Sequence, residues 1–146
     1  MGTGIQLKLG LGVQPMYYPE HATSGSFVKG DPVDLAGGKV AYITADSKIF
    51  GIALADYSGT EDTLVPVERI FPDVDYVMVC DTTTAVAYVG EDYGLNIAAG
   101  ATTVNVGETS TVSVVVQGLD PRDAVGTDGG RLIVRFKPAV IQGLTG

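Results

Sequence analysis

Closely spaced turn residues between positions 27 and 54 leave room only for short strands. Gly37-Gly38 separates two apolar runs, and adjacent glycines are typical of a tight hairpin because they accept positive φ. Pro32 has no amide hydrogen for a strand ladder, so it suits the first residue of a strand. We therefore predict a compact β-meander over residues 27–54, with later strands completing its core.

Length and composition extend this prediction to the whole chain. The 146 residues suit one domain, and twenty glycines, seven prolines and no tryptophan favour an all-β fold with many turns. We predict a small β-barrel-like domain over residues 26–146. Further strands are expected at 64–67, 76–80, 82–89, 109–116 and 131–137, with a break at 90–94 and an open hairpin around Gly100.

The single cysteine and the hydropathy pattern indicate the compartment in which the protein is made. Cys80 has no partner for an internal disulfide and lies in an apolar run, so we expect a buried, inert thiol in a protein made in a reducing cytoplasm. The sequence contains no apolar stretch of membrane-spanning length, and its N-terminus lacks the pattern of a signal peptide. We expect no membrane partner.

The net charge of −8 is concentrated in the middle of the chain. Residues 56–92 contain nine acids and one base, Arg69, while the flanking parts are together neutral. An acidic surface repels phosphate backbones, so we expect no nucleic-acid partner. Solvated acidic loops that keep the protein soluble are the interpretation that we favour for this segment.

Residues 1–25 differ in pattern from the domain that follows. Apolar residues alternate with Gln6, Lys8, Gly10 and Gly12, and two prolines and a polar stretch then separate the segment from the meander. One interpretation is a first strand of the same sheet. The other, which we favour, is an arm that docks on another molecule. Its candidate contact residues are Ile5, Leu7, Leu9, Leu11, Val13, Tyr17 and Tyr18.

The last predicted strand concentrates positive charge on one face. Leu132, Val134 and Phe136 alternate with Arg131, Arg135 and Lys137, which are three of the nine basic residues. These bases either pair with the protein's own acidic loops or form a contact face for an acidic partner.

The residue constellations that enzyme sites require are largely missing from the sequence. His21 is the only histidine and lies in a polar linker, so an acid–base or nucleophilic site that depends on histidine is not expected. One cysteine and one histidine do not suffice for zinc, and no phosphate-binding glycine loop occurs. Asp73 with Asp75, and the acids at 120, 123 and 128, match no calcium-loop spacing. We expect no catalytic site, no cofactor and no metal.

Two stretches resemble a known family. Residues 27–54 have the pattern F-x-K-G-D-P-V, a Gly-Gly hairpin and I-x-G-I-A-L, and Gly129–Val134 resembles the closing strand of phage structural modules. With the apolar arm, this is similar to the capsid decoration (cement, head-stabilising) proteins of tailed bacteriophages, of the type of the lambda head decoration protein. The residues that carry the resemblance are Phe27, Lys29, Gly30, Asp31, Pro32, Val33, Gly37, Gly38, Gly51 and Ile52.

The resemblance implies a β-tulip fold and a non-enzymatic virion protein on the capsid surface. Its partner would be the shell of major capsid protein, bound as a homotrimer at three-fold or quasi-three-fold sites and stabilising the shell against the pressure of the genome. These families attach through N-terminal segments, which fits the arm. The alternative is a phage tail, fibre or host-surface binding module, and a carboxylate-dependent or metal-dependent hydrolase is a third, less favoured class.

Overall fold

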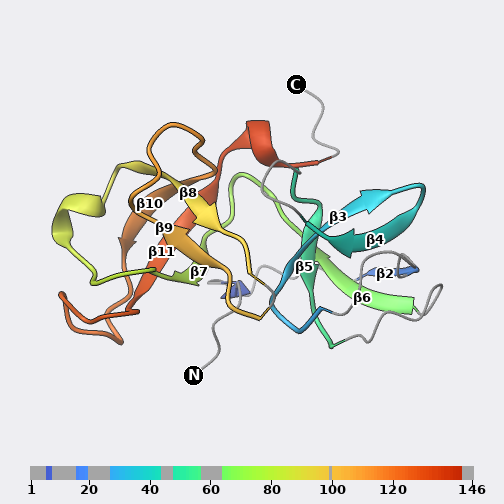
Figure 1. The fold of residues 1–146 in the computed structure, drawn as a ribbon, viewed down its shortest axis with the longest axis horizontal. Coiled ribbons are helices and arrows are strands. Elements are labelled where there is room, and N and C mark those ends of the chain that lie inside the picture. Colours follow the sequence, from blue (N-terminus) through green and yellow to red (C-terminus); the bar gives the residue numbers. More distant parts are fainter. Residues whose placement is uncertain are drawn as a thin grey trace.

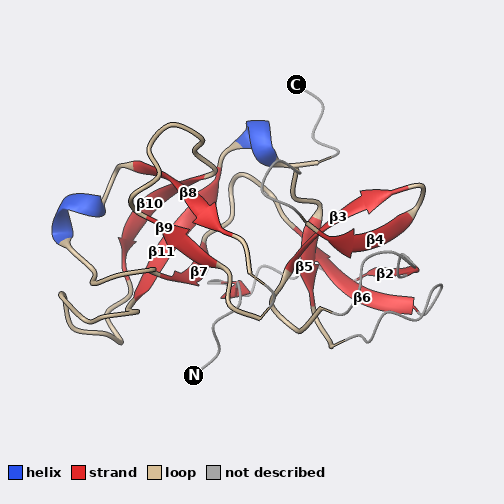
Figure 2. Ribbon diagram, viewed as in Figure 1, coloured by secondary structure: helices blue, strands red, loops and turns tan. Residues whose placement is uncertain are grey.

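The computed structural model describes residues 6–7, 16–19, 27–43, 48–56, 64–98 and 100–142, and these residues form strands and short turns (Figures 1 and 2). The only helical segments in these ranges are two single 3-10 turns, so the all-β prediction is confirmed. The elements are β1 (Gln6–Leu7), β2 (Met16–Pro19), β3 (Pro32–Ala36), β4 (Lys39–Tyr42), β5 (Gly51–Ala53), β6 (Leu64–Arg69), β7 (Tyr76–Val79), η1 (Val86–Tyr88), β8 (Asp92–Asn96), β9 (Thr103–Asn105), β10 (Val114–Leu119), β11 (Arg131–Phe136) and η2 (Pro138–Val140).

The larger lobe is a six-stranded sheet in the order β1-β7-β11-β10-β8-β9, with antiparallel neighbours. The sheet curls until β9 meets the end of β7: Cys80 forms a bridge with Val104, and the Asp81 amide donates to the Val104 carbonyl at 3.0 Å. This lobe lies on the left of Figure 1. Its curvature gives the barrel-like form that the sequence predicted.

The smaller lobe is a five-stranded sheet in the order β2-β6-β5-β3-β4, and it contains the predicted meander. Pro32 begins β3, as expected for a residue without an amide hydrogen. Gly37 and Gly38 connect β3 to β4 with φ of 60° and 80°, which is the positive φ pair of a tight hairpin turn. The meander and its hairpin are thus confirmed.

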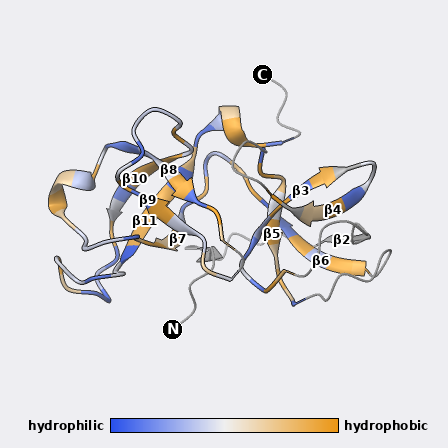
Figure 3. Ribbon diagram, in the orientation of Figure 1, coloured by the Kyte–Doolittle hydropathy of each residue, from blue (hydrophilic) through white to orange (hydrophobic). Residues whose placement is uncertain are grey.

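Each lobe encloses its own hydrophobic core, and apolar residues follow the strands of both (Figure 3). In the larger lobe, Tyr76 and Phe136 pack edge to face at 5.4 Å between ring centroids. The smaller core consists of Phe27, Val33, Val40, Phe50, Ala53, Val65 and Val67, all at most 5% exposed. The expected single core is therefore divided in two.

The strand β5 joins the two cores because it is buried on both faces. Ala53 packs in the smaller core, whereas Ile52 packs in the larger one. Ile43, Ile49 and Ile70 of the smaller lobe also belong to the larger core. The lobes therefore share apolar contacts.

Two polar links also connect the lobes. The buried Asp31 carboxylate accepts the amide hydrogens of Val28 at 2.9 Å and of Gly100, in the loop between β8 and β9, at 2.7 Å. Beyond η2, Ile141 bridges Ile49, and the Gln142 side chain pairs with the backbone of Leu35 in β3. A buried carboxylate requires such donors because it has left water.

The described parts of residues 1–25 pair with the chain's own sheets. β1 lies against β7, with Leu7 opposite Tyr76, and β2 lies against β6, with Tyr17 and Tyr18 opposite Pro66 and Val65. Both are outermost strands in their sheets. The first-strand interpretation thus holds for Met16–Pro19, which joins the sheet of the meander, whereas Gln6–Leu7 joins the other sheet. Docking of the arm on another molecule stays a prediction.

Two predictions for the middle of the chain are wrong. Residues 82–89 form no strand, because the Thr84 backbone pairs with Thr127 and Gly126 and the chain then enters η1. The expected break at 90–94 falls partly in β8. Gly94 interrupts the apolar pattern there because a Cβ would lie 2.5 Å from the Glu108 side chain and 2.6 Å from the Thr111 carbonyl oxygen.

A substitution at Gly51 tests the close approach of β5 to β6. A Cβ at Gly51 would lie 2.5 Å from both the Glu68 carbonyl oxygen and Val67 Cγ1, so the strands must separate. We expect Gly51→Ala to lower the free energy of unfolding by about 1–3 kcal/mol, measured by urea denaturation. Gly118→Ala is the control because no atom lies within 4 Å of its Cβ position. An equal effect of both substitutions would contradict the explanation.

Candidate functional site

The strand β11 has the predicted alternation. Leu132, Val134 and Phe136 are at most 1% exposed and belong to the larger core, while Arg131 and Arg135 lie on the other face. β11 lies between β7 and β10, so its backbone is fully enclosed in the sheet. The basic residues predicted as a contact face therefore stand on a rigid support.

Each of these three bases pairs with an acid of the same chain. Arg131 Nε donates to Asp123 Oδ2 at 2.8 Å, and its Nη2 donates to Oδ1 at 2.9 Å. Arg135 Nε lies 2.6 Å from Asp75 Oδ1, and Lys137 pairs with Asp92. The interpretation that these bases pair with the protein's own acidic loops is confirmed. Their role toward an acidic partner stays a prediction, and it would require exchange of these ion pairs.

Two ion pairs brace the loop that leads into β11. The Asp120 carboxylate accepts the Arg122 backbone amide at 2.9 Å and the Arg122 Nε at 3.0 Å, and it thereby caps the turn that begins at Asp120. The Arg122 side chain lowers the pKa of Asp120. The hydrogen bonds from the Arg131 side chain lower the pKa of Asp123 to about 2. Both carboxylates are thus held charged by their partners.

The arm residues lie only partly in the described structure. Leu7 is in β1 at the edge of the larger lobe, and Tyr17 and Tyr18 are in β2 at the edge of the smaller lobe. Ile5, Leu9, Leu11 and Val13 lie outside the described residues. The described arm candidates therefore lie at two different sheet edges. The strand β11, which carries the predicted basic residues, lies at neither edge.

Burial raises the pKa of several titratable groups in the described ranges. Cys80 is buried, as predicted, and burial raises the pKa of its thiol. Burial also raises the pKa of Asp31, against the effect of its two amide donors. Among the described residues, no group of three His, Cys, Asp or Glu side chains is arranged to hold a metal ion. The described part of the chain also contains no helix long and apolar enough to cross a membrane.

The structure reveals one surface feature that the sequence analysis missed. Hydrogen bonds between Thr84 and the backbone of Gly126 and Thr127 join two loops of the larger lobe, and both loops expose aliphatic side chains. We call this surface the valine tip. It consists of Val86, Ala87, Val89, Ala124 and Val125. The repeated Ala and Val residues were visible in the sequence but resembled strand residues, because only the fold determines that they face solvent.

Comparison of the chain with protein-family models, with curated proteins and with solved structures finds no match. The functional assignment therefore rests on the sequence and on the geometry above.

The ion pair between Asp123 and Arg131 predicts a defined pH dependence. Because the folded state lowers the pKa of Asp123 from 3.8 to about 2, the stability it contributes is complete above 3.8 and is lost as the pH falls toward 2. We expect Asp123→Asn to be less stable than the unmodified protein at pH 6, with a difference that shrinks between pH 4 and pH 2. Urea denaturation at each pH measures this.

The control for this experiment is Asp73→Asn, an exposed acid outside the ion pairs of the described residues. It should change stability little at any of these pH values. A difference between Asp123→Asn and the unmodified protein that is independent of pH would contradict the assigned role of the carboxylate charge.

Proposed function

We propose that the protein is a structural virion protein that binds the outside of a tailed-phage capsid and stabilises the shell. The family resemblance of residues 27–54 supports this, since its glycine pair forms the hairpin turn and Gly51 lies in the shared strand β5. The partner is the shell of major capsid protein, and binding takes place as a homotrimer at three-fold or quasi-three-fold sites.

The placement of the N-terminal segment carries the proposal. Its described stretches are outer strands, since β1 ends the larger sheet beside β7 and β2 ends the smaller sheet beside β6. An outer strand is paired on one side of the sheet, so a neighbouring molecule can pair with it or take its place, as in strand addition or domain swapping. The alternating aliphatic residues of the arm then bury apolar surface against the neighbour or the shell.

The internal pairing of charges is consistent with a structural role. Ion pairs and capped turns of the larger lobe hold its loops in place without a partner. Such a body loses little conformational entropy when it binds, so most of the interaction free energy is available for attachment. The alternative, a tail, fibre or host-surface binding module, would show binding to host cells instead of shells.

The first functional prediction concerns the assembly state. The protein is expected to be trimeric in solution or to become trimeric on the shell, because its short outer strands leave sheet edges for neighbouring copies. Light scattering measures the state in solution, and cryo-electron microscopy of decorated shells measures it at the three-fold positions. A single copy at each three-fold position would contradict the prediction.

The second functional prediction concerns the arm. Deleting residues 1–14 removes β1 and retains β2, so the Tm of the domain should change little. Binding to shells should be lost, because each buried aliphatic side chain contributes roughly 1.5–3 kcal/mol. Cosedimentation with empty shells measures binding, and a thermal melt measures the fold.

A pair of charge variants refines this test. Leu7→Asp with Leu9→Asp should abolish binding, whereas Gln6→Asp with Gln14→Asp adds the same charge at the alternate positions and should retain it. An unfolded truncation would mean that the segment is an essential strand. Full affinity of the truncated protein would place the attachment elsewhere, with Arg131, Arg135 and Lys137 as the next candidates.

A further inference from the structure

The valine tip gathers much of the exposed apolar surface of the described chain. Six large hydrophobic side chains are exposed among the described residues, and three of them are here: Val86 at 67%, Val125 at 58% and Val89 at 42%. Ala87 and Ala124 beside them are exposed as well. Apolar side chains that gather on two adjoining loops indicate a contact surface more strongly than scattered ones do.

Hydrogen bonds hold the two loops of the tip together. Buried Thr84 accepts the Gly126 amide at 3.0 Å through its carbonyl oxygen and also at 3.0 Å through Oγ1, and its own amide donates to Thr127 at 3.1 Å. The Gly90 amide donates to Val116 in β10 at 2.8 Å, which ties the end of η1 to the sheet. The surface is thus formed before any partner arrives, so binding orders few groups.

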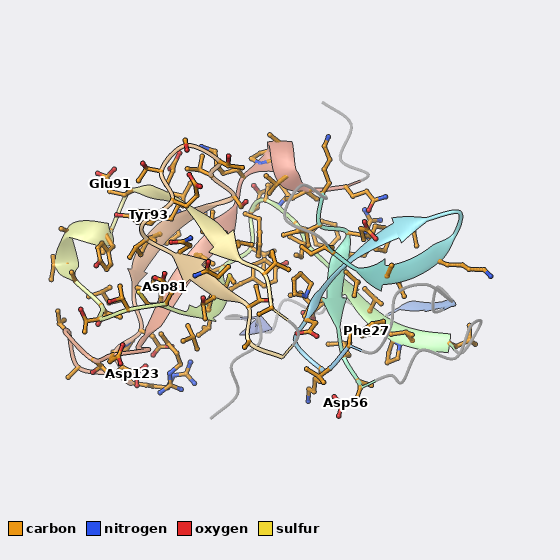
Figure 4. The ribbon with its side chains drawn as sticks, in the orientation of Figure 1. Phe27, Asp56, Asp81, Glu91, Tyr93 and Asp123 are labelled. Carbon is orange, nitrogen blue, oxygen red and sulfur yellow. The ribbon has the colours of Figure 1, made fainter. Side chains whose placement is uncertain are left out.

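The charge at the rim of the tip is negative. Arg122 and Arg131 are each paired with an aspartate. The exposed carboxylates of Glu91 and Asp128 make no hydrogen bond or ion pair with any residue in the described ranges. Figure 4 shows Glu91 at the upper edge and Asp123 at the lower edge of the larger lobe, on opposite sides of the surface that the two loops form. An apolar centre with an acidic rim complements an apolar patch with lysines or arginines around it.

The negative charges at the rim argue against three other partners: a second copy of the chain, an anionic lipid surface and a nucleic acid. Two copies of the tip would bring like charges together, and an anionic lipid surface or a nucleic acid would be repelled. We therefore propose that the valine tip is a second attachment surface for the capsid shell, seated on an apolar patch with a basic rim on the major capsid protein. This rests on the proposed function and adds to the arm a rigid contact that does not depend on it.

The apolar part is tested by titrating empty shells of the virus that encodes the chain with two double variants. Val86→Ser with Val125→Ser removes the two most exposed side chains of the tip, and we expect at least a roughly tenfold loss of affinity. Val28→Ser with Leu64→Ser is the matched control on exposed residues elsewhere and should bind as the unmodified protein does. Thermal melts establish that both variants fold.

The charged part is tested by single variants that leave the apolar residues in place. Glu91→Lys should lower the affinity by at least about tenfold and reduce its salt sensitivity, whereas Asp73→Lys, an equal charge change on the loop before β7, should have little effect. If Val86→Ser with Val125→Ser fails to fold, Glu91→Lys still tests whether the valine tip binds the shell.

The outcomes separate this inference from the proposed function. If the unmodified protein does not bind shells, the proposed function is wrong, and the inference is overturned with it. If the unmodified protein binds and the tip variants bind equally well, the protein is a decoration protein that attaches by other residues, and only the inference is overturned. Loss of binding in the control variants but not in the tip variants would assign the contact to the smaller lobe and overturn it too.

Discussion

The burial of β5 on both faces is the constraint on which the two lobes depend. Ala53 and Phe50 contribute to the smaller core, and Ile52 contributes to the larger one. A displacement of this strand would expose apolar surface of both cores at once, so neither lobe can open without loosening the other. The short distance between β5 and β6 at Gly51 belongs to the same constraint. We infer that the two curled sheets behave as one folding unit rather than as independent domains.

The sequence predicted those elements that are determined by the preferences of neighbouring residues. Gly37-Gly38 could be read as a hairpin turn because positive φ is a property of the residues themselves. The strand Arg131–Phe136 could be predicted because successive side chains of a strand point to opposite faces, which gives an alternating pattern of polar and apolar residues. The all-β class followed from many such signals. The division into two cores did not, because it depends on which sheet each apolar run joins.

The features that the sequence did not predict arise from distant partners. Residues 82–89 have strand propensity, yet Thr84 pairs with Gly126, forty-two positions away, and turns the chain outward. Arg135 could be seen as a candidate contact residue, but its partner Asp75 is sixty positions away and could not be identified from spacing. The valine tip was missed for the same reason. The fold determines which side chains are exposed, so the sequence of an Ala-Val run does not show whether the run lies in a core or on a surface.

The pairing of Gln142 with Leu35 has a consequence for how the chain reaches its native state. These residues are 107 positions apart, and the backbone N–H of Gln142 also donates to the Ile49 carbonyl oxygen at 2.8 Å. The hairpin of β3 and β4 can form early because its contacts are local, but β3 acquires these partners only after the chain has closed a loop of more than a hundred residues. Contacts of such long range slow folding because the entropy of loop closure opposes them before they form. Docking of the C-terminal segment on the smaller lobe therefore has an entropic cost of loop closure that the hairpin of β3 and β4 does not have.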